Sequence, residues 1–182
     1  ELMRVIGIDP GTVSFDICGI EDDGAAERIF IDDSFPSPDL GKDPAALIDA
    51  VMRCLPLDLA VGPSGYGLPL VRGEDVGERE LSLMLLVRAD ESKGPVGIGG
   101  MRGLIRGLIA TGAPLIFVPG AIHLPSVPAY RKANRIDMGT ADKVCSVAQA
   151  IVEQARRLSI RYDETSFIML ELGGAFSAAL AV

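Results

Sequence analysis

The sequence predicts an α/β fold in which an antiparallel three-strand meander enters a mixed sheet flanked by helices. Residues 3–9, 14–21 and 26–32 are apolar or alternating runs joined by short turns, a pattern typical of consecutive antiparallel strands. From there to residue 164, segments with helical spacing alternate with apolar strands. A meander followed by this alternation predicts a mixed sheet that helices cover.

The meander is predicted from the faces of its strands and from its turns. The opening run MRVIGID has an apolar centre, so we expect a buried strand. In the second run, Phe15, Ile17 and Gly19 are two residues apart and share one face. Asp22-Asp23-Gly24 is typical of a turn and leads into the third strand.

The later elements follow from changes of period along the chain. In order, we expect a helix over 47–55, a strand over 57–63, an irregular Gly- and Pro-rich connection over 64–79, a segment at 81–88 that fits either a strand or a helix, a helix over 98–110, a strand over 114–120, a helix from the N-cap Thr140 to residue 158, and strands over 166–174 and 175–182. The last two strands begin a new unit, because they repeat a pattern from the start of the chain.

That repeat joins the two ends of the chain. IDPGT at residues 8–12 and LELGG at residues 170–174 both hold an apolar strand end, an acid, a variable residue, a glycine and a small residue. Internal similarity of this kind is typical of duplicated units. We therefore expect one domain over residues 1–164, and over residues 165–182 the first hairpin of a duplicate whose remainder is absent from the chain.

The repeated hairpins have the composition of a phosphate site. Glycine lets the backbone approach an anion closely, and successive N–H groups in a tight turn form a nest for it. The expected donors to phosphate are Gly11, Thr12, Ser14, Gly173, Gly174 and Ser177. An acid beside phosphate needs Mg²⁺ between them, so Asp9 is the predicted metal ligand, facing one cleft with its counterpart Glu171. For either hairpin alone, the alternative is a structural turn with a solvated acid.

Composition limits the partners and the compartment. The net charge is −8 and the pI is near 4.6, which disfavours a nucleic-acid binder because such proteins neutralise phosphates with Lys and Arg. Cys18, Cys54 and Cys145 are scattered in apolar runs and are predicted to be buried free thiols, which suits the cytoplasm. Since no apolar run is long enough to span a bilayer, we expect no membrane partner.

Five segments carry a resemblance to a known family. They are VIGIDPGTVSFDI, GPSGYGLPLVRG, IFVPGAIHLPSVPAY, NRIDMGTADKV and MLELGGAFSAALAV, in that order along the chain. Together they resemble the acetate and butyrate kinase branch of the sugar kinase, heat-shock ATPase and actin (ASKHA) superfamily, and most of all an archaeal family described as predicted butyrate kinases. The resemblance implies a ribonuclease-H-like (actin-like ATPase) domain, with ATP and Mg²⁺ as cofactors in the cleft between two duplicated domains.

The resemblance also implies three catalytic side chains. His123 matches the family's Ala-x-His segment, and Arg72 matches its functional arginine. Glu171 stands where butyrate kinases have a histidine, and Ala175 stands where they have a glycine. From the residues alone, His123 is equally a capped loop residue, and Arg72 is more readily a solvated surface arginine.

The start of the helix at residue 140 has two interpretations. Thr140 suits an N-cap, and Asp142 complements the helix dipole. A helix N-terminus that points into a cleft also binds anions, so the same residues are candidates for the substrate pocket.

The function implied by the resemblance is phosphoryl transfer from ATP to a small carboxylic acid, giving an acyl phosphate and ADP. Two alternatives stay open: a hydroxyl acceptor with Glu171 as the base, as in sugar kinases, and a regulatory ATPase that needs no acceptor. The 182-residue chain alone is expected to be inactive, because the adenosine motif of a second domain is not in it. Kinases of this branch are commonly dimers, so a homodimer is the expected assembly.

Overall fold

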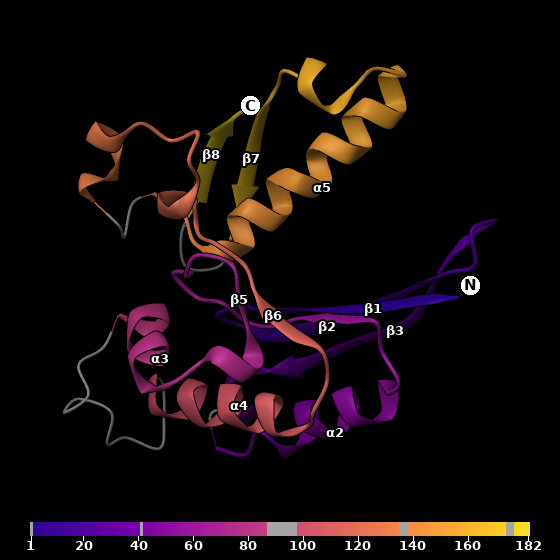
Figure 1. The fold of residues 1–182 in the computed structure, drawn as a ribbon, viewed down its shortest axis with the longest axis vertical. Coiled ribbons are helices and arrows are strands. Elements are labelled where there is room, and N and C mark those ends of the chain that lie inside the picture. The colour runs from indigo at the N-terminus through magenta and orange to yellow at the C-terminus, as the bar shows by residue number, and fades with distance from the viewer. Residues whose placement is uncertain (1, 41, 87–97, 135–137, 174–176) are drawn as a thin grey trace.

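The strands of the molecule form one large sheet and one small sheet. The computed structural model describes residues 2–40, 42–86, 98–134, 138–173 and 177–182. The large sheet is mixed and six-stranded, in the order β3-β2-β1-β4-β6-β5 (Figure 1). Its strands are β1 (Met3–Pro10), β2 (Ser14–Asp22), β3 (Glu27–Pro36), β4 (Leu59–Val61), β5 (Val71–Arg72) and β6 (Leu115–Phe117). This mixed sheet with its helices confirms the predicted α/β class.

Strand directions determine which strand ends meet. β1 pairs antiparallel with β2, and β2 with β3, which confirms the predicted meander. β4 runs parallel to β1, and β6 runs parallel to β4, while the short β5 is antiparallel to β6. The carboxyl ends of β1, β4 and β6 therefore lie at one edge of the sheet, where open α/β sheets commonly bind ligands.

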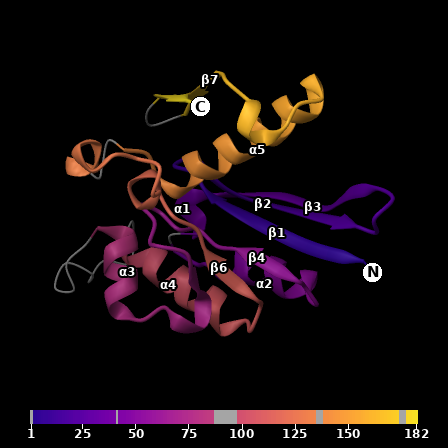
Figure 2. The same ribbon diagram turned by 45° about the horizontal axis from the view of Figure 1, so that its top comes forward.

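Helices lie on both faces of the large sheet. On one face lie α2 (Ala45–Cys54), α3 (Glu78–Leu85) and α4 (Ile98–Ala110), and on the other lies α5 (Ala141–Leu158) (Figure 1, Figure 2). The core is apolar, and its largest fully buried side chains include Ile6, Ile17, Leu47, Leu81, Met84, Leu104, Ile105, Leu108 and Phe117. Among the described residues, no helix is both long and apolar enough to cross a bilayer.

Short elements and proline positions explain where prediction and structure differ. Residues 81–85 of the ambiguous segment at 81–88 belong to the helix α3, and residues 87–88 lie outside the described residues. The predicted strand at 114–120 shrinks to β6. Pro114 and Pro119 flank β6, and proline cannot donate to a strand ladder. The remaining short elements are α1 (Ser37–Leu40) and the 3₁₀ turns η1 (Gly73–Asp75), η2 (Ala121–His123), η3 (Ala129–Ala133) and η4 (Tyr162–Glu164).

The helix α5 is anchored chiefly at its first turn. Ala141 and Lys143 are buried there, and the Ala141 N–H donates a 2.9 Å hydrogen bond to the carbonyl of Gly65, in the loop after β4. Thr140 occupies the N-cap position as predicted, with extended backbone, but its side chain makes no capping hydrogen bond to the helix. The start of α5 is thus held against the carboxyl edge of the sheet.

The second hairpin forms a sheet of its own. β7 (Ile168–Leu172) pairs antiparallel with β8 (Ser177–Ala181), and in the described part of the chain this pair forms no ladder with the large sheet. It lies on the same side of the large sheet as α5 (Figure 1). Its assignment to a second domain over residues 165–182 stays a prediction.

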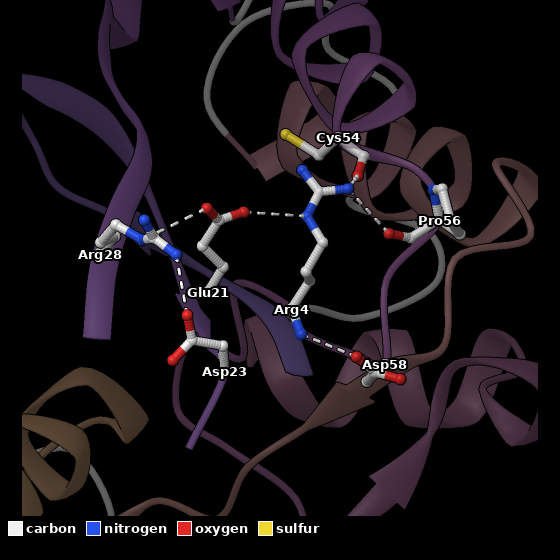
Figure 3. Close-up of polar contacts among 7 residues, drawn as sticks. All are labelled: Arg4, Glu21, Asp23, Arg28, Cys54, Pro56 and Asp58. Atoms are coloured by element: carbon white, nitrogen blue, oxygen red, sulfur yellow. Dashed lines mark hydrogen bonds and ion pairs between the residues drawn. The ribbon is translucent and has the colours of Figure 1, made fainter. Parts of the chain in front are cut away.

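Arg4 ties the start of the first hairpin to the end of α2. Its guanidinium Nη1 donates to the carbonyls of Cys54 (3.0 Å) and Pro56 (3.2 Å), and Nε lies 3.7 Å from a carboxylate oxygen of Glu21 (Figure 3). The Arg4 backbone N–H donates to Asp58 at 2.7 Å. These contacts fix the amino-terminal end of β1, which lies far from the carboxyl edge of the sheet.

Candidate functional site

An acidic cavity lies at the carboxyl edge of the large sheet. It has a volume of about 410 Å³ and is bounded by the ends of β1 and β4, the residue after β6, the first turn of α5 and one residue of β7. The chemically active side chains that line it are Asp9, Asp16, Cys18, Asp142, Cys145, Ser146 and Glu171. The structure thus brings Asp9 and Glu171, the acids of the two repeated hairpins, into one cavity.

Asp9 reaches the cavity because of where β1 ends. It lies opposite Asp16 in the β1–β2 ladder, one residue before the strand ends at Pro10. The turn that follows is tight: a Cβ on Gly11 would come within 2.5 Å of the Ser14 carbonyl oxygen, so only glycine fits. The turn therefore leaves Asp9 at the strand tip with its carboxylate on the cavity wall.

Lys143 connects the first turn of α5 to the second hairpin. Its side chain is only 6% exposed, and its ammonium donates at 2.6 Å to Asp142 and also pairs with Glu171 of β7. Burial alone would lower the pKa of Lys143, but the hydrogen bonds to the two carboxylates raise it, so the ammonium stays charged. For Asp142, burial is likewise outweighed by hydrogen bonds from Lys143 and Thr140, which lower its pKa.

The charge balance of the cavity is negative. Burial raises the pKa of Asp9, and the nearby carboxylates of Asp142, Asp16 and Glu171 raise it further, against a smaller lowering by Lys143. Ionised Asp9 is therefore held in an unfavourable field, which a bound cation would relieve. Oε2 of Glu171 is buried and, in the part of the chain described, has no hydrogen-bond partner.

A metal at this site would need ligands beyond the described side chains. Among the described residues, no three His, Cys, Asp or Glu side chains converge closely enough to hold an ion by themselves. Mg²⁺ suits such a place, because it usually takes one or two carboxylates and completes its shell with water and phosphate oxygens. The residues present fit a Mg²⁺–phosphate ligand with Asp9 as its carboxylate.

The floor of the cavity is built from backbone in the loop after β4. The buried Ser64 hydroxyl accepts a 2.9 Å hydrogen bond from the Val118 N–H, after β6. The Tyr66 N–H donates to the Met84 carbonyl of α3 at 3.0 Å. Gly67 has φ +81°, and a Cβ there would lie 2.1 Å from the nitrogen of Gly120. The loops after β4 and β6 therefore touch backbone to backbone, which requires glycine.

The cysteines only partly match the prediction. All three are free thiols, but only Cys54 is buried, while Cys18 and Cys145 are exposed toward the cavity. Burial, together with the carboxylates of Asp142 and Asp9, raises the pKa of Cys145. The thiol is thus held protonated, which suits a binding wall better than a nucleophile.

The predicted phosphate donors of the first hairpin lie beside the acidic cavity rather than in it. Gly11 and Thr12 line a neighbouring apolar cavity. The Ser14 hydroxyl donates at 3.1 Å to Asp16, so it supports the wall of the acidic cavity from behind.

The described donors that were predicted in the second hairpin are exposed. Gly173 is exposed, and Ser177 is exposed opposite Leu172 at the start of β8. Gly174 lies outside the described residues. The phosphate-binding roles of all these residues stay predictions.

Two predicted catalytic residues lie elsewhere. Arg72 is on β5, with a side chain 76% exposed and 3.8 Å from Glu74, and it lines a different cavity together with Asp58 at the amino end of β4. Because β5 runs antiparallel to β6, it carries Arg72 away from the carboxyl edge. His123 is half-buried in η2, and its backbone N–H donates to the Gly120 carbonyl. The described lining of the acidic cavity does not include His123.

Sequence reasoning missed Asp16 and the contact that Lys143 makes. Asp16 lies between the core residues Phe15 and Ile17, so its alternation placed it on the opposite face of β2. Lys143 belongs to the helix start that was a candidate for anion binding, but its partner Glu171 is 28 residues further along the chain. Strand alternation was a usable signal for Asp16, but nothing local indicated the contact of Lys143.

Comparisons with known proteins give a family and distant structural neighbours. The family described as "Protein of unknown function (DUF1464)" matches residues 7–182. No curated protein matches the chain. Among solved structures, a propionate kinase from Francisella tularensis subsp. tularensis SCHU S4 is similar at 11% identity and a TM-score of 0.49, over 99% of this chain and 54% of that one. The chain thus spans about half the length of that kinase. The closer resemblance to butyrate kinases stays a prediction.

Proposed function

The chain belongs to the DUF1464 family, and we propose that it is part of an ATP- and Mg²⁺-dependent phosphotransferase whose acceptor is a carboxylic acid. One observation carries the proposal: four carboxylates, from both hairpins and from α5, line one cavity, and two of them pair with the buried Lys143. Such an excess of negative charge favours a cation, and a cation with open coordination positions favours phosphate. The sequence resemblance to acetate and butyrate kinases supports the choice of acceptor.

The fold supports the proposal at the level of topology. An antiparallel meander, β3-β2-β1, followed by parallel β4 and β6 agrees with the ribonuclease-H-like domain that the resemblance implies. In such a domain the acid at the end of the first strand faces the nucleotide. Asp9 has this position, at the carboxyl edge.

Different residues at the cavity would bind different parts of a phosphorylated ligand. Bound Mg²⁺–ATP supplies the transferable phosphoryl group and neutralises part of its charge. Asp9 would hold the metal side, while Lys143 and the amino end of α5 would offer positive charge to phosphate oxygens. Asp142 and Glu171 keep Lys143 charged and fixed, so binding needs little rearrangement.

Glu171 favours a second candidate, transfer to a hydroxyl group. Its Oε2 is buried without a hydrogen-bond partner in the described part of the chain, so it is available to accept a proton. A carboxylate acceptor has no proton to give, whereas an alcohol has one. The regulatory ATPase alternative would hydrolyse ATP at the same rate with and without an acceptor.

Calorimetric titration of the chain with ATP tests the proposal. We expect binding with Mg²⁺ present, little binding with EDTA in place of Mg²⁺, and loss of binding in Asp9→Asn. Asp23→Asn, in the distant β2–β3 turn, is the matched control and should bind like the parent. Equal binding by Asp9→Asn and the parent, or absence of binding by the longest form of the protein that folds, would contradict the proposal.

The acceptor is tested in the longest form of the protein that folds. Trapping with hydroxylamine gives a coloured hydroxamate only from an acyl phosphate. A signal that depends on added carboxylic acid supports the first candidate. ADP release that depends on an added alcohol, with no hydroxamate, supports the second, and ADP release without any acceptor supports the ATPase.

A further inference from the structure

A second cavity lies directly beside the acidic one and is of opposite character. It has a volume of about 610 Å³ and shares Pro10 and Gly65 with the acidic cavity. Its described lining holds no charged side chain. The apolar side chains of its wall are Phe15, Leu40, Met84, Leu85, Met101 and Leu104. Two adjoining cavities, one charged and one apolar, are what an amphipathic ligand requires.

The roof of the apolar cavity is the tip of the first hairpin. Gly11 and Thr12 of the turn line it, next to Asp9 in the chain. The Ser37 hydroxyl of α1 donates at 2.7 Å to the Gly11 carbonyl, and the Ser37 N–H donates at 3.0 Å to the Val13 carbonyl. The turn is therefore fixed over the cavity, and its backbone separates an apolar space from the acids.

We propose that the apolar cavity binds the hydrocarbon body of the acceptor, a carboxylic acid considerably longer than acetate or butyrate. This inference rests on the proposed function and names the substrate class of that site. The carboxylate head would stay on the acidic side of Pro10 and Gly65, because the described wall of the apolar cavity offers no countercharge. The ammonium of Lys143 pairs with Asp142 and Glu171, which line the acidic side.

The volume of the cavity and the side chains in its wall favour a long carboxylic acid over a short one as the ligand. Its volume lies in the range of sites for drug-sized ligands, about 300–1,000 Å³, so a two- or four-carbon acid would leave most of it empty. Met84 and Met101 lie in its wall, and methionine adapts its shape to flexible apolar ligands. Phe15, Leu40 and Leu104 belong to the main core, so packing against the core holds this part of the cavity wall in place.

The proposal predicts a dependence of affinity on chain length. Each methylene moved from water into an apolar site should raise affinity about fourfold, so octanoate should bind far more tightly than butyrate. In NMR spectra of the parent chain with isotope-labelled methionine methyl groups, octanoate should shift the Met84 and Met101 signals. Met52, on the outer face of α2, should not respond. Equal affinities for butyrate and octanoate, or shifts at Met52 alone, would overturn the proposal.

A pair of matched variants places the binding in this cavity. Met101→Trp fills it, while Met52→Trp puts the same ring on an exposed helix position. We expect at least tenfold weaker octanoate binding in Met101→Trp and unchanged binding in Met52→Trp. Undiminished binding in a folded Met101→Trp protein would overturn the proposal. Should that variant not fold, the methionine shifts of the parent chain decide the question.

The inference and the proposed function fail separately. Octanoate binding together with no binding of Mg²⁺–ATP would retain the apolar site but remove its role as an acceptor site. Binding of Mg²⁺–ATP without any octanoate response would retain the phosphotransferase and overturn the long-chain acceptor. Asp9→Asn should lose Mg²⁺–ATP and keep the Met84 and Met101 shifts.

Discussion

The two repeated hairpins have the same sequence pattern but very different surroundings. In the first, Ile6, Ile8, Phe15 and Ile17 are each less than 10% exposed, because β4 and β3 pair on either side and helices cover one face. In the second, Ile168, Leu170 and Leu172 are at least 70% exposed on one face of a two-stranded ribbon. An isolated ribbon of this kind is marginally stable by itself.

The comparison separates what a local pattern determines from what the rest of the fold determines. Acid, glycine and small residues determine a hairpin with an acid near its tip in both places. Burial comes from neighbouring strands and helices, which cover the first hairpin on both sides. Among the described residues, the ion pair of Glu171 with Lys143 ties the second hairpin to α5.

The largest expected effect contrasts the two apolar faces. Ile17→Ala should lower the free energy of unfolding by about 2–5 kcal/mol, since a fully buried side chain leaves a cavity. Leu170→Ala, at a 70% exposed position, should change it by less than about 0.5 kcal/mol. Urea denaturation measures both. A large cost for Leu170→Ala would mean that its face is covered in solution, and the comparison would fail.

The next effect concerns the link between α5 and the second hairpin. Lys143→Met should cost about 1–3 kcal/mol, because it leaves the carboxylates of Asp142 and Glu171 without their shared donor. When Glu171 has already been replaced by Gln, Lys143→Met should cost less. A double-mutant cycle would measure the difference. Lys143→Arg is the matched control and should restore part of the loss. Additive single and double variants would show that the pair is not coupled.

A smaller effect is expected at the other end of the first hairpin. Arg4→Met removes two hydrogen bonds to the carbonyls that end α2, along with the ion pair to Glu21, and should cost about 1–2 kcal/mol. The control is Arg28→Met, a 61% exposed partner of the same Glu21, with an expected change below about 0.5 kcal/mol. Thermal unfolding of both variants checks this, and equal losses would contradict it.

The smallest expected effect is the change in stability caused by Asp9→Asn, and its sign shows whether the carboxylate serves a ligand or the fold. Because the pKa of Asp9 is raised in the folded protein, its contribution to stability is present in acid and is lost as pH rises through that raised pKa. Asp9→Asn should therefore stabilise the protein slightly at neutral pH, and the gain should vanish on acidification. Melting temperatures over a pH series measure it. A variant that is destabilised at neutral pH would show that the carboxylate serves the fold instead of a ligand.

The parts of the fold set by local signals were predictable. The meander followed from turn residues and period, and α5 followed from a long amphipathic pattern. The helix α3 was ambiguous, since eight residues fit two periods, and β5 has only two residues. Elements this short depend on tertiary pairing, which cannot be inferred from a short stretch of sequence.

The site was predictable where the chain repeats itself and at the start of α5, which supplies Asp142. Asp9 and Glu171 were found because the repeat marks them. Arg72 was assigned to the site from its segment, but the direction of β5 takes it to the other end of the sheet. Lys143 acts across a long sequence separation, so its contact with Glu171 is visible only in three dimensions.

The loop after β4 contributes to both cavities, so we expect ligands in the two cavities to depend on each other thermodynamically. Its Gly65 carbonyl is bonded to Ala141 at the start of α5, and its Tyr66 N–H to Met84 of α3, so adjacent residues hold one wall of each cavity. A ligand that shifts α5 strains the same backbone that a ligand against α3 uses. By reciprocity, nucleotide and acid should then change each other's affinity by one common factor, which makes cooperativity a property of this loop.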